Sequence, residues 1–466
     1  MTRARLILLT AAVAVCVPAA FATLTFGQAP PGSWLAAYRD PSQRIIREAQ
    51  ADDFAWRRLA ELTDTFGHRL SGSTALEDAI EWIADQMRKD GLENVRLDPV
   101  MVPHWVRGQE SAEIVKPSLQ PIAMLGLGGS VGTPPEGLEA EAVIVQSFEE
   151  LDAKSYAARG KIVVFNEQFA SYNETVQYRV GGPARAARYG AMAALVRSVA
   201  PAGSRTPHTG STTYASNTPR IPAAAISAED ADHLQRFQDR GVPVVIRLKM
   251  EAHQLPDAPS NNVMGELRGR ENPDEVVVVG GHIDSWDVGA GALDDGGGCI
   301  ATWEAVRLLK KLGLRPRRTV RVVLFTNEEN GVRGGQAYRD KYRADLKNHV
   351  MMLESDIGLF APIGFGFTGS PAARAQITEI AKLLRDVGSN RIGSVGGGAD
   401  IGPSVDTASI PSMSLEADNT RYFFIHHTAA DTVDKVTPAE ISRAAASIAV
   451  MAYVIADLPT RLDGDQ

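Results

Sequence analysis

The feature that most constrains the fold is a regular alternation of short apolar strands and longer helical patterns over the C-terminal half of the chain. Val276 to Val279 form an unbroken run of valines, which is typical of a parallel strand buried on both faces. Parallel strands need crossovers, so this alternation predicts a mostly parallel sheet with helices on both faces. The predicted strands are 276–280, 319–326 and 350–354, and the predicted helices are 299–311, 333–342, 372–386 and 438–457. The sequence therefore predicts an α/β fold of three layers, α/β/α, around a mostly parallel mixed sheet.

The first half of the chain divides into two parts of different character. Three helical patterns and one alternating strand occupy residues 41–105, and a stretch rich in glycine and proline at 117–137 then marks a boundary. Short apolar strands follow, with few residues that bind metals. We therefore expect an N-terminal part of the main domain at 35–115, an inserted β-rich domain that covers a site at 116–255, and the C-terminal part of the main domain, which carries the site, at 256–458.

The N-terminus has the pattern of a secretory signal peptide. Two arginines precede an apolar run, Leu6 to Val17, and small residues follow it. We expect residues 1–29 to be a signal peptide and leader, and the mature protein to be secreted or periplasmic. The alternative is a retained anchor, but the apolar run is short for a membrane span. We therefore expect no stable membrane association after cleavage.

Charge and cysteine content narrow the class of protein further. The formal net charge is -8 and no basic run is present, which argues against nucleic acid as a partner. The only cysteines are Cys16 and Cys299, so cleavage leaves a single thiol and no intrachain disulfide. The stability of such a protein must come from its core and from any bound metal.

Histidines and carboxylates follow each predicted strand of the C-terminal half. Taken singly, such residues are most often helix caps or solvated helix starts. The carboxyl ends of parallel strands meet at one edge of a sheet, however, so we expect these side chains to converge there on a cation. The candidates are His282, Asp284, Asp294, Asp295, Glu328, Glu329, Asp356, His426 and His427.

This mixture of residue types suits a pair of zinc ions. Two neighbouring ions need one bridging carboxylate, and each needs in addition a histidine and another carboxylate. A further carboxylate that binds no metal must take the proton from the attacking water. The adjacent Glu328 and Glu329 can divide these tasks, because neighbouring side chains diverge.

The motifs together resemble the co-catalytic di-zinc aminopeptidase/carboxypeptidase family. The motifs are His282-Ile-Asp284, Asp294-Asp295-Gly-Gly-Gly, Asn327-Glu328-Glu329, Glu354-Ser355-Asp356 and His427-Thr-Ala-Ala-Asp431. The combination is specific, whereas a single His-x-Asp is weak. The resemblance spans residues 40–458, and the inserted segment resembles a protease-associated domain.

The resemblance implies a role for each residue of the site. It implies two Zn2+ per chain, with Asp294 as the bridging ligand and Glu328 as the general base. It implies that the Asp284 side chain fixes the tautomer of His282, and we read Asp295 as a loop cap. The remaining implied ligands are His282, Glu329, Asp356 and His427. His426 occupies a place where several relatives carry a tyrosine, so it either donates a hydrogen bond to the oxyanion of the tetrahedral intermediate or merely packs.

The expected function is a di-zinc metallo-exopeptidase that hydrolyses short peptides, dipeptides in particular, at a carboxyl-terminal residue. The first alternative is an aminopeptidase with the same site, and a less favoured one is a non-catalytic, receptor-like relative. A zinc-dependent cyclising acyltransferase shares the sheet, but it typically uses fewer ligands for one zinc. The resemblance alone implies a homodimer.

Two further segments are candidates for the substrate pocket. His208, within His-Thr-Gly-Ser-Thr-Thr-Tyr, is a candidate substrate contact from the insert, and the alternative is a satisfied structural histidine. The glycine-rich loop 396–400 lacks the lysine and hydroxyl of a phosphate loop. We therefore expect this loop to line the substrate site rather than to bind a nucleotide.

Overall fold

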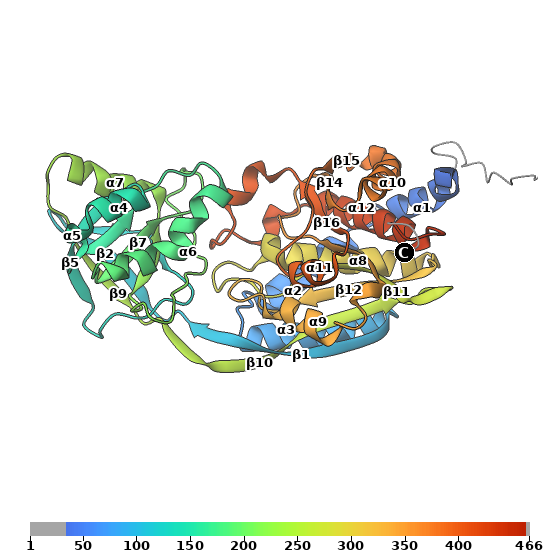
Figure 1. Ribbon diagram of the computed structural model, residues 1–466, viewed down its shortest axis with the longest axis horizontal. Coiled ribbons are helices and arrows are strands. Elements are labelled where there is room, and N and C mark those ends of the chain that lie inside the picture. The colour runs from blue at the N-terminus through green and yellow to red at the C-terminus, as the bar shows by residue number, and fades with distance from the viewer. Residues whose placement is uncertain (1–33, 463–466) are drawn as a thin grey trace, which may run out of the picture.

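The computed structural model describes residues 34–462, so the predicted signal peptide and leader, 1–29, lie outside the described residues. Two lobes lie side by side along the long axis of the molecule (Figure 1). Each contains an eight-stranded sheet, and we call them the main lobe and the second lobe. A two-stranded ribbon runs from one lobe to the other (Figure 1); it consists of β1 (Glu93–Val106) and β10 (His253–Leu267), which pair antiparallel.

The main-lobe sheet has the strand order β1-β10-β12-β11-β13-β16-β14-β15. Its central strands β12, β11, β13 and β16 are parallel, whereas β10 is antiparallel to β12 and β14 to β16, so the sheet is mixed and mostly parallel at its centre. The carboxyl ends of the parallel strands meet at one edge of the sheet. The strand bounds are β11 Asn272–His282, β12 Arg318–Phe325, β13 His349–Glu354, β14 Pro362–Thr368, β15 Arg391–Gly393 and β16 Ser412–Ala417.

Helices cover both faces of this sheet. Successive side chains of a strand point to opposite faces, and Val277 and Val279 accordingly belong to one apolar core and Val276 and Val278 to another. This arrangement confirms the predicted α/β fold. The first face packs against α1 (Arg39–Ala49), α2 (Phe54–Phe66), α3 (Thr74–Lys89), α8 (Gly297–Lys311), α10 (Pro371–Ala381) and α12 (Pro438–Asp457), and the second against α9 (Arg333–Lys341) and α11 (Gly402–Ala408).

Among the described residues, α12 is the one helix that is long and apolar enough to cross a membrane. Its side chains are mostly buried in the core of the main lobe, where α12 packs against α8 and α1. A central core helix has the same length and composition as a membrane span, so α12 carries no argument for a membrane.

The second lobe has its own sheet, with the order β3-β2-β9-β5-β6-β7-β8-β4. The sequence predicts a β-rich unit at 116–255. However, β5 to β8 are parallel, and helices connect β5 to β6 and β6 to β7, so this lobe is also α/β. The sheet begins at Glu110 rather than 116, because β2 pairs with β9. Its elements are β2 Glu110–Lys116, β3 Gln120–Ile122, β4 Met124–Gly126, β5 Leu138–Val145, α4 Phe148–Ala153, α5 Ser155–Ala158, β6 Ile162–Phe165, α6 Tyr172–Arg188, β7 Ala193–Arg197, β8 Ala223–Ile226, α7 Ala228–Asp239 and β9 Val245–Met250.

Candidate metal centre

His282 is the last residue of β11, so its side chain leaves the sheet at the edge where the parallel strands end. Its Nε2 lies 3.2 Å from Oδ1 of Asp356 and 3.3 Å from Oδ1 of Asp294. Its Nδ1 lies 2.9 Å from the backbone oxygen of Asp284. A proton on Nδ1 donates to that carbonyl and leaves the Nε2 lone pair available to a metal.

The carboxylate of Asp284 does not make the hydrogen bond to His282 that the resemblance implies. Its Oδ1 lies 3.7 Å from Nδ1 of His282, farther away than the backbone carbonyl of the same residue. Instead, the carboxylate accepts hydrogen bonds from the backbone N–H groups of Glu328 (3.0 Å) and Glu329 (3.3 Å). Asp284 therefore holds the turn after β12 and, with it, both glutamates.

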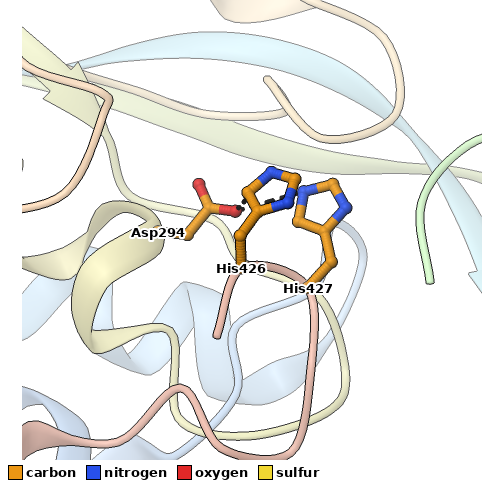
Figure 2. Close-up of side chains that lie close together, drawn as sticks. All are labelled: Asp294, His426 and His427. Carbon is orange, nitrogen blue, oxygen red and sulfur yellow. Dashed lines mark ion pairs between the residues drawn. The ribbon is translucent and has the colours of Figure 1, made fainter. Parts of the chain in front are cut away.

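Asp294 lies between two groups of donors. Its Oδ1 faces His282, whereas its Oδ2 lies 3.1 Å from Nε2 of His427 and 3.4 Å from Nε2 of His426. Figure 2 shows the carboxylate directed at the two histidine rings, which come from the turn after the 3-10 helix Asn419–Phe424. One buried carboxylate thus reaches two sets of ring nitrogens, as a bridging ligand must.

Glu329 and His427 complete the second group. Nε2 of His427 lies 3.0 Å from Oε2 of Glu329, and both side chains are buried. Two carboxylate oxygens here are buried and make no hydrogen bond: Oε1 of Glu329, and Oδ2 of Asp294, which only faces the ring nitrogens of His426 and His427. A buried charged oxygen that lacks a partner is costly, and a cation removes that cost. These oxygens and nitrogens fit zinc, which prefers His and Asp/Glu ligands.

Crowding of carboxylates shifts their acidity. Burial, with the neighbouring charge of Asp294, raises the pKa of Glu329 to about 7. Burial also raises the pKa of Asp356, and it raises that of Glu328 well above the usual range. Several carboxyl groups therefore resist ionisation together unless positive charge is placed among them.

Two further aspartates shape the loop that carries Asp294. Oδ2 of Asp295 accepts a hydrogen bond from the backbone N–H of His282 and Oδ1 accepts one from that of Gly298, both at 3.1 Å. Asp295 therefore caps the start of α8, in agreement with the sequence interpretation. The carboxylate of Asp431 accepts the N–H groups of residues 292, 293 and 294.

His426 stacks on His427, with ring centroids 3.5 Å apart. It also packs edge-on against Tyr172 of α6. Its Nε2 approaches Asp294 more loosely than that of His427 does, and its Nδ1 is buried without a partner. Burial and the adjacent His427 hold the pKa of His426 well below the usual range, so the ring is neutral.

A cavity of about 500 Å³ opens beside these groups, between the two lobes. Glu328 lines it together with Asp294, Glu329 and Asp356. Arg179 of α6 is the one lysine or arginine among its lining residues. The other lining residues are Ser171, Tyr172, Asn173, Ser211, Ile357, Asn419, Tyr422, Phe423, His426 and His427.

Sequence reasoning missed most of what the second lobe contributes. Tyr172, Arg179 and Ser211 line the cavity, and of this lobe only His208 was a candidate. His208 is not a lining residue; its Nδ1 lies 2.7 Å from the backbone oxygen of His426. For Ser211 the one signal was the segment 208–214, which combines a histidine with five hydroxyl side chains; no motif marked Tyr172 or Arg179.

The glycine-rich loop 396–400 also differs from the prediction. It is absent from the cavity lining, and Asp400 is buried with its backbone N–H donating to Oε2 of Glu354 at 3.1 Å. The loop therefore packs against the end of β13, and its glycines permit this close approach: a Cβ at Gly398 would lie 2.1 Å from the Glu354 carboxyl carbon.

The fold and the site together define a metal-dependent hydrolase. Two groups of His and carboxylate donors, which share Asp294, lie at the carboxyl edge of a parallel sheet. Open α/β proteins bind their ligands at this edge. A further carboxylate, Glu328, also lines the cavity.

Comparison with known proteins identifies the family. The model of peptidase family M28 matches residues 262–452. Carboxypeptidase Q of Homo sapiens is 46% identical over 431 residues, which cover 92% of this chain and 91% of that protein. The chain belongs to peptidase family M28. It is a zinc metallopeptidase, a metallo-exopeptidase that resembles carboxypeptidase Q.

Solved structures agree with this assignment. A peptidase M28 precursor from Shewanella amazonensis matches with a TM-score of 0.88 and 32% identity, over 91% of this chain and 98% of that one. A zinc aminopeptidase from Bacillus subtilis matches with a TM-score of 0.65 and 20% identity, over 88% and 96% of the two chains. At that identity, the second match shows the fold alone.

Proposed function

We propose that this chain is an exopeptidase that uses two zinc ions to hydrolyse dipeptides and other short peptides. The observation that carries the proposal is Asp294, whose two oxygens face different histidines. His282 and Asp356 would hold one ion, His427 and Glu329 would hold the other, and Asp294 would bridge them. The unpartnered buried oxygens of Asp294 and Glu329 support this assignment.

Glu328 is the proposed general base. When bound, the ions supply Lewis-acid chemistry: they lower the pKa of a water molecule and polarise the scissile carbonyl. Glu328 takes the proton of the attacking water and delivers it to the leaving amine. Burial raises the pKa of this carboxyl well above its usual range, so its carboxylate is a stronger base than that of an exposed glutamate.

His426 is the proposed donor to the developing oxyanion. It lines the cavity beside Asp294, and its ring is neutral because burial lowers its pKa. A neutral imidazole donates from one ring nitrogen, and an oriented donor of this kind stabilises the negative charge of the tetrahedral intermediate. Stacking on His427 and the edge contact with Tyr172 hold the ring in place.

Selection of the carboxyl terminus follows from the charges in the cavity. Arg179 is its one lysine or arginine, and the Nε of this residue is buried without a hydrogen-bond partner. A guanidinium matches the geometry of a carboxylate, so we assign Arg179 to the free carboxyl end of the substrate. The alternative is an aminopeptidase, in which the acidic groups at the site would hold the free amine.

The domain organisation and the location are further parts of the proposal. We propose that the second lobe is an inserted domain of the protease-associated type, and that the chain is secreted or periplasmic after loss of its signal peptide. The sequence similarity of the whole chain to carboxypeptidase Q supports both proposals. A homodimer rests on the resemblance alone, and sedimentation of the purified protein tests it.

Three measurements test the proposed function. Metal analysis of the purified chain is expected to give two zinc ions, and a chelator is expected to abolish hydrolysis until zinc is restored. One ion would favour a single-zinc acyltransferase, and none would favour a receptor-like protein. Hydrolysis of N-acetylated dipeptides but not of C-terminal amides is expected; the reverse preference identifies an aminopeptidase.

A further inference from the structure

A short segment of the second lobe, His208–Ser211, reaches into the metal centre; we call it the strap. Its backbone makes two contacts with His427. The backbone N–H of Thr209 donates to the backbone oxygen of His427 at 3.0 Å. The backbone oxygen of Thr209 lies 3.1 Å from Nδ1 of the same histidine. The strap therefore fixes the main chain of His427, and its carbonyl selects the tautomer whose Nε2 faces Asp294 and Glu329.

The strap also holds the neighbours of His427. Nδ1 of His208 lies 2.7 Å from the backbone oxygen of His426, and the hydroxyl of Ser211 donates to the backbone oxygen of Glu329 at 2.8 Å. Three of the four hydrogen bonds end on the group of donors formed by His427 and Glu329, and the fourth ends on the adjacent His426. Both sides of that group, the turn with His427 and the turn with Glu329, are thus joined through the second lobe.

The strap is itself firmly anchored. Gly128 accepts a hydrogen bond from the backbone N–H of Thr212 at 2.9 Å and donates one to the backbone oxygen of Gly210 at 3.0 Å. Nη1 of Arg179 donates to the backbone oxygen of Thr209 at 3.2 Å. Gly210 has a φ of +139°, and a Cβ there would lie 2.3 Å from Cζ of Arg179, so only glycine allows this approach.

The other group of donors has no such support. Nδ1 of His282 bonds to the backbone of Asp284 within its own loop, and Asp356 directly follows β13. Among the hydrogen bonds and ion pairs of residues 34–462, none joins His282 or Asp356 to the second lobe. The main lobe alone therefore shapes this side of the site.

We propose that the strap of the second lobe is a structural part of one metal position, that of His427 and Glu329, and sets its affinity, whereas the position of His282 and Asp356 does not depend on it. This inference rests on the proposed two-zinc function. Groups that orient a ligand from outside typically change metal affinity about 10- to 100-fold. His208 and Ser211 are thus positioning residues that act through the backbone of the site.

Metal binding to the full chain tests the proposal. Zinc retained at graded free zinc concentrations would be measured for His208→Ala, Ser211→Ala and the double variant. We expect one ion to bind about 10- to 100-fold more weakly and the other to be unchanged. His208→Asn is expected to restore binding, because its side-chain amide nitrogen can stand near the place of Nδ1. Anomalous scattering from crystals is expected to find the remaining ion between His282 and Asp356.

Thr213→Ala, two residues after the strap, is the matched control. Thr213 is exposed, and its side chain bonds only to the backbone oxygen of Val180. This variant is expected to keep both ions. If the variants of the strap lose both ions equally, or lose neither, the inference is wrong while the two-zinc function stands. If the wild-type chain binds fewer than two ions, the proposed function fails first. Ser211→Ala removes one partly exposed hydroxyl, so it provides a folded variant even if His208→Ala does not fold.

Discussion

The neighbouring pair Glu328 and Glu329 shows how adjacent residues of one type acquire different tasks. The carboxylate of Asp284 holds both backbone N–H groups, so the turn is fixed and the two side chains diverge. Oε2 of Glu329 lies against His427, whereas Glu328 contacts neither histidine and lines the cavity. Adjacent positions in a fixed turn thus place one carboxylate against His427 and the other at the cavity, which supports the proposed roles of ligand and proton acceptor.

Replacing Glu328 by Gln is expected to lower kcat by about 10²- to 10⁴-fold, because the variant cannot accept a proton from water. Its zinc content is expected to equal that of the wild type, since Glu328 is not a proposed ligand. Glu329→Gln is the matched control and is expected to weaken zinc binding. Loss of zinc from Glu328→Gln would reverse the two assignments. Steady-state kinetics and metal analysis of both variants distinguish the two assignments.

His426→Ala is expected to lower kcat by about 10²- to 10³-fold through loss of a donor to the oxyanion. Zinc content is expected to remain intact, whereas His427→Ala is expected to lose an ion. If His426→Ala loses zinc instead, His426 is the ligand. Unchanged kcat with intact zinc would show that His426 only packs.

At the scale of elements, the strands and helices with strong apolar periodicity were predictable. The last helix, 438–457, and the valine strand at 276–280 coincide with α12 and the centre of β11. β10 was not predicted, because it contains two prolines and its outer half is exposed on the ribbon, so no apolar alternation marks it. β14 and β16 were also missed: they are short, and their antiparallel pairing is a tertiary feature.

The first turn of α12 provides a stability prediction. Thr437 and Glu440 form a capping box: the Thr437 side chain accepts the N–H of Glu440, and the Glu440 carboxylate accepts the N–H of Thr437. Thr437→Ala is expected to lower the free energy of unfolding by about 1 kcal/mol without changing zinc content. Thr378→Ala, at an exposed position inside α10, is the control and is expected to change it by less than about 0.5 kcal/mol. Equal effects in chemical denaturation would exclude a contribution from the cap.

At the scale of the whole molecule, the metal centre joins two lobes that each have their own sheet and apolar core. The main lobe provides every proposed ligand, and the second lobe provides the strap, Arg179 and Tyr172. The cavity lies between them, so its shape depends on how the lobes pack against each other. A change at that contact can therefore alter both substrate selection and metal binding.

The buried carboxyl groups predict how stability depends on pH. Burial raises the pKa values of Glu329, Glu354 and Asp431 to about 7, from ordinary values near 4. Between about pH 4 and 7, the folded metal-free chain therefore holds protons that the unfolded chain has released. These protons stabilise the folded chain fully below about pH 4, and this stabilisation is lost as the pH rises through 7. The free energy of unfolding falls by at most about 1.4 kcal/mol per group and pH unit.

Thermal unfolding checks this prediction. With a chelator present, the melting temperature is expected to fall between pH 5 and pH 8. With zinc present, the fall is expected to be absent or reversed, because zinc displaces protons from its ligands and binds more tightly as the pH rises. A melting temperature of the chelated protein that increases over this range would contradict the prediction.

The sequence alone predicted which side chains of the main lobe meet at the edge of the sheet. His282, Glu329 and Asp356 each lie at or just after a parallel strand, and parallel strands bring their carboxyl ends to one edge whatever the details of packing. The pattern of strands and helices was enough to infer that such side chains converge.

Only the tertiary structure decided how the site is supported. The carbonyl of Thr209 and Nδ1 of His427 belong to residues 218 positions apart, and no periodicity or local motif links them. A backbone carbonyl has no side-chain identity, so the sequence cannot mark it as an acceptor. The same reason applies to the backbone oxygen of Asp284, which meets His282 in place of the expected carboxylate. Such contacts form only when whole strands, helices and lobes pack against each other. The composition of the chain and the spacing of its residues therefore do not predict an individual contact of this kind.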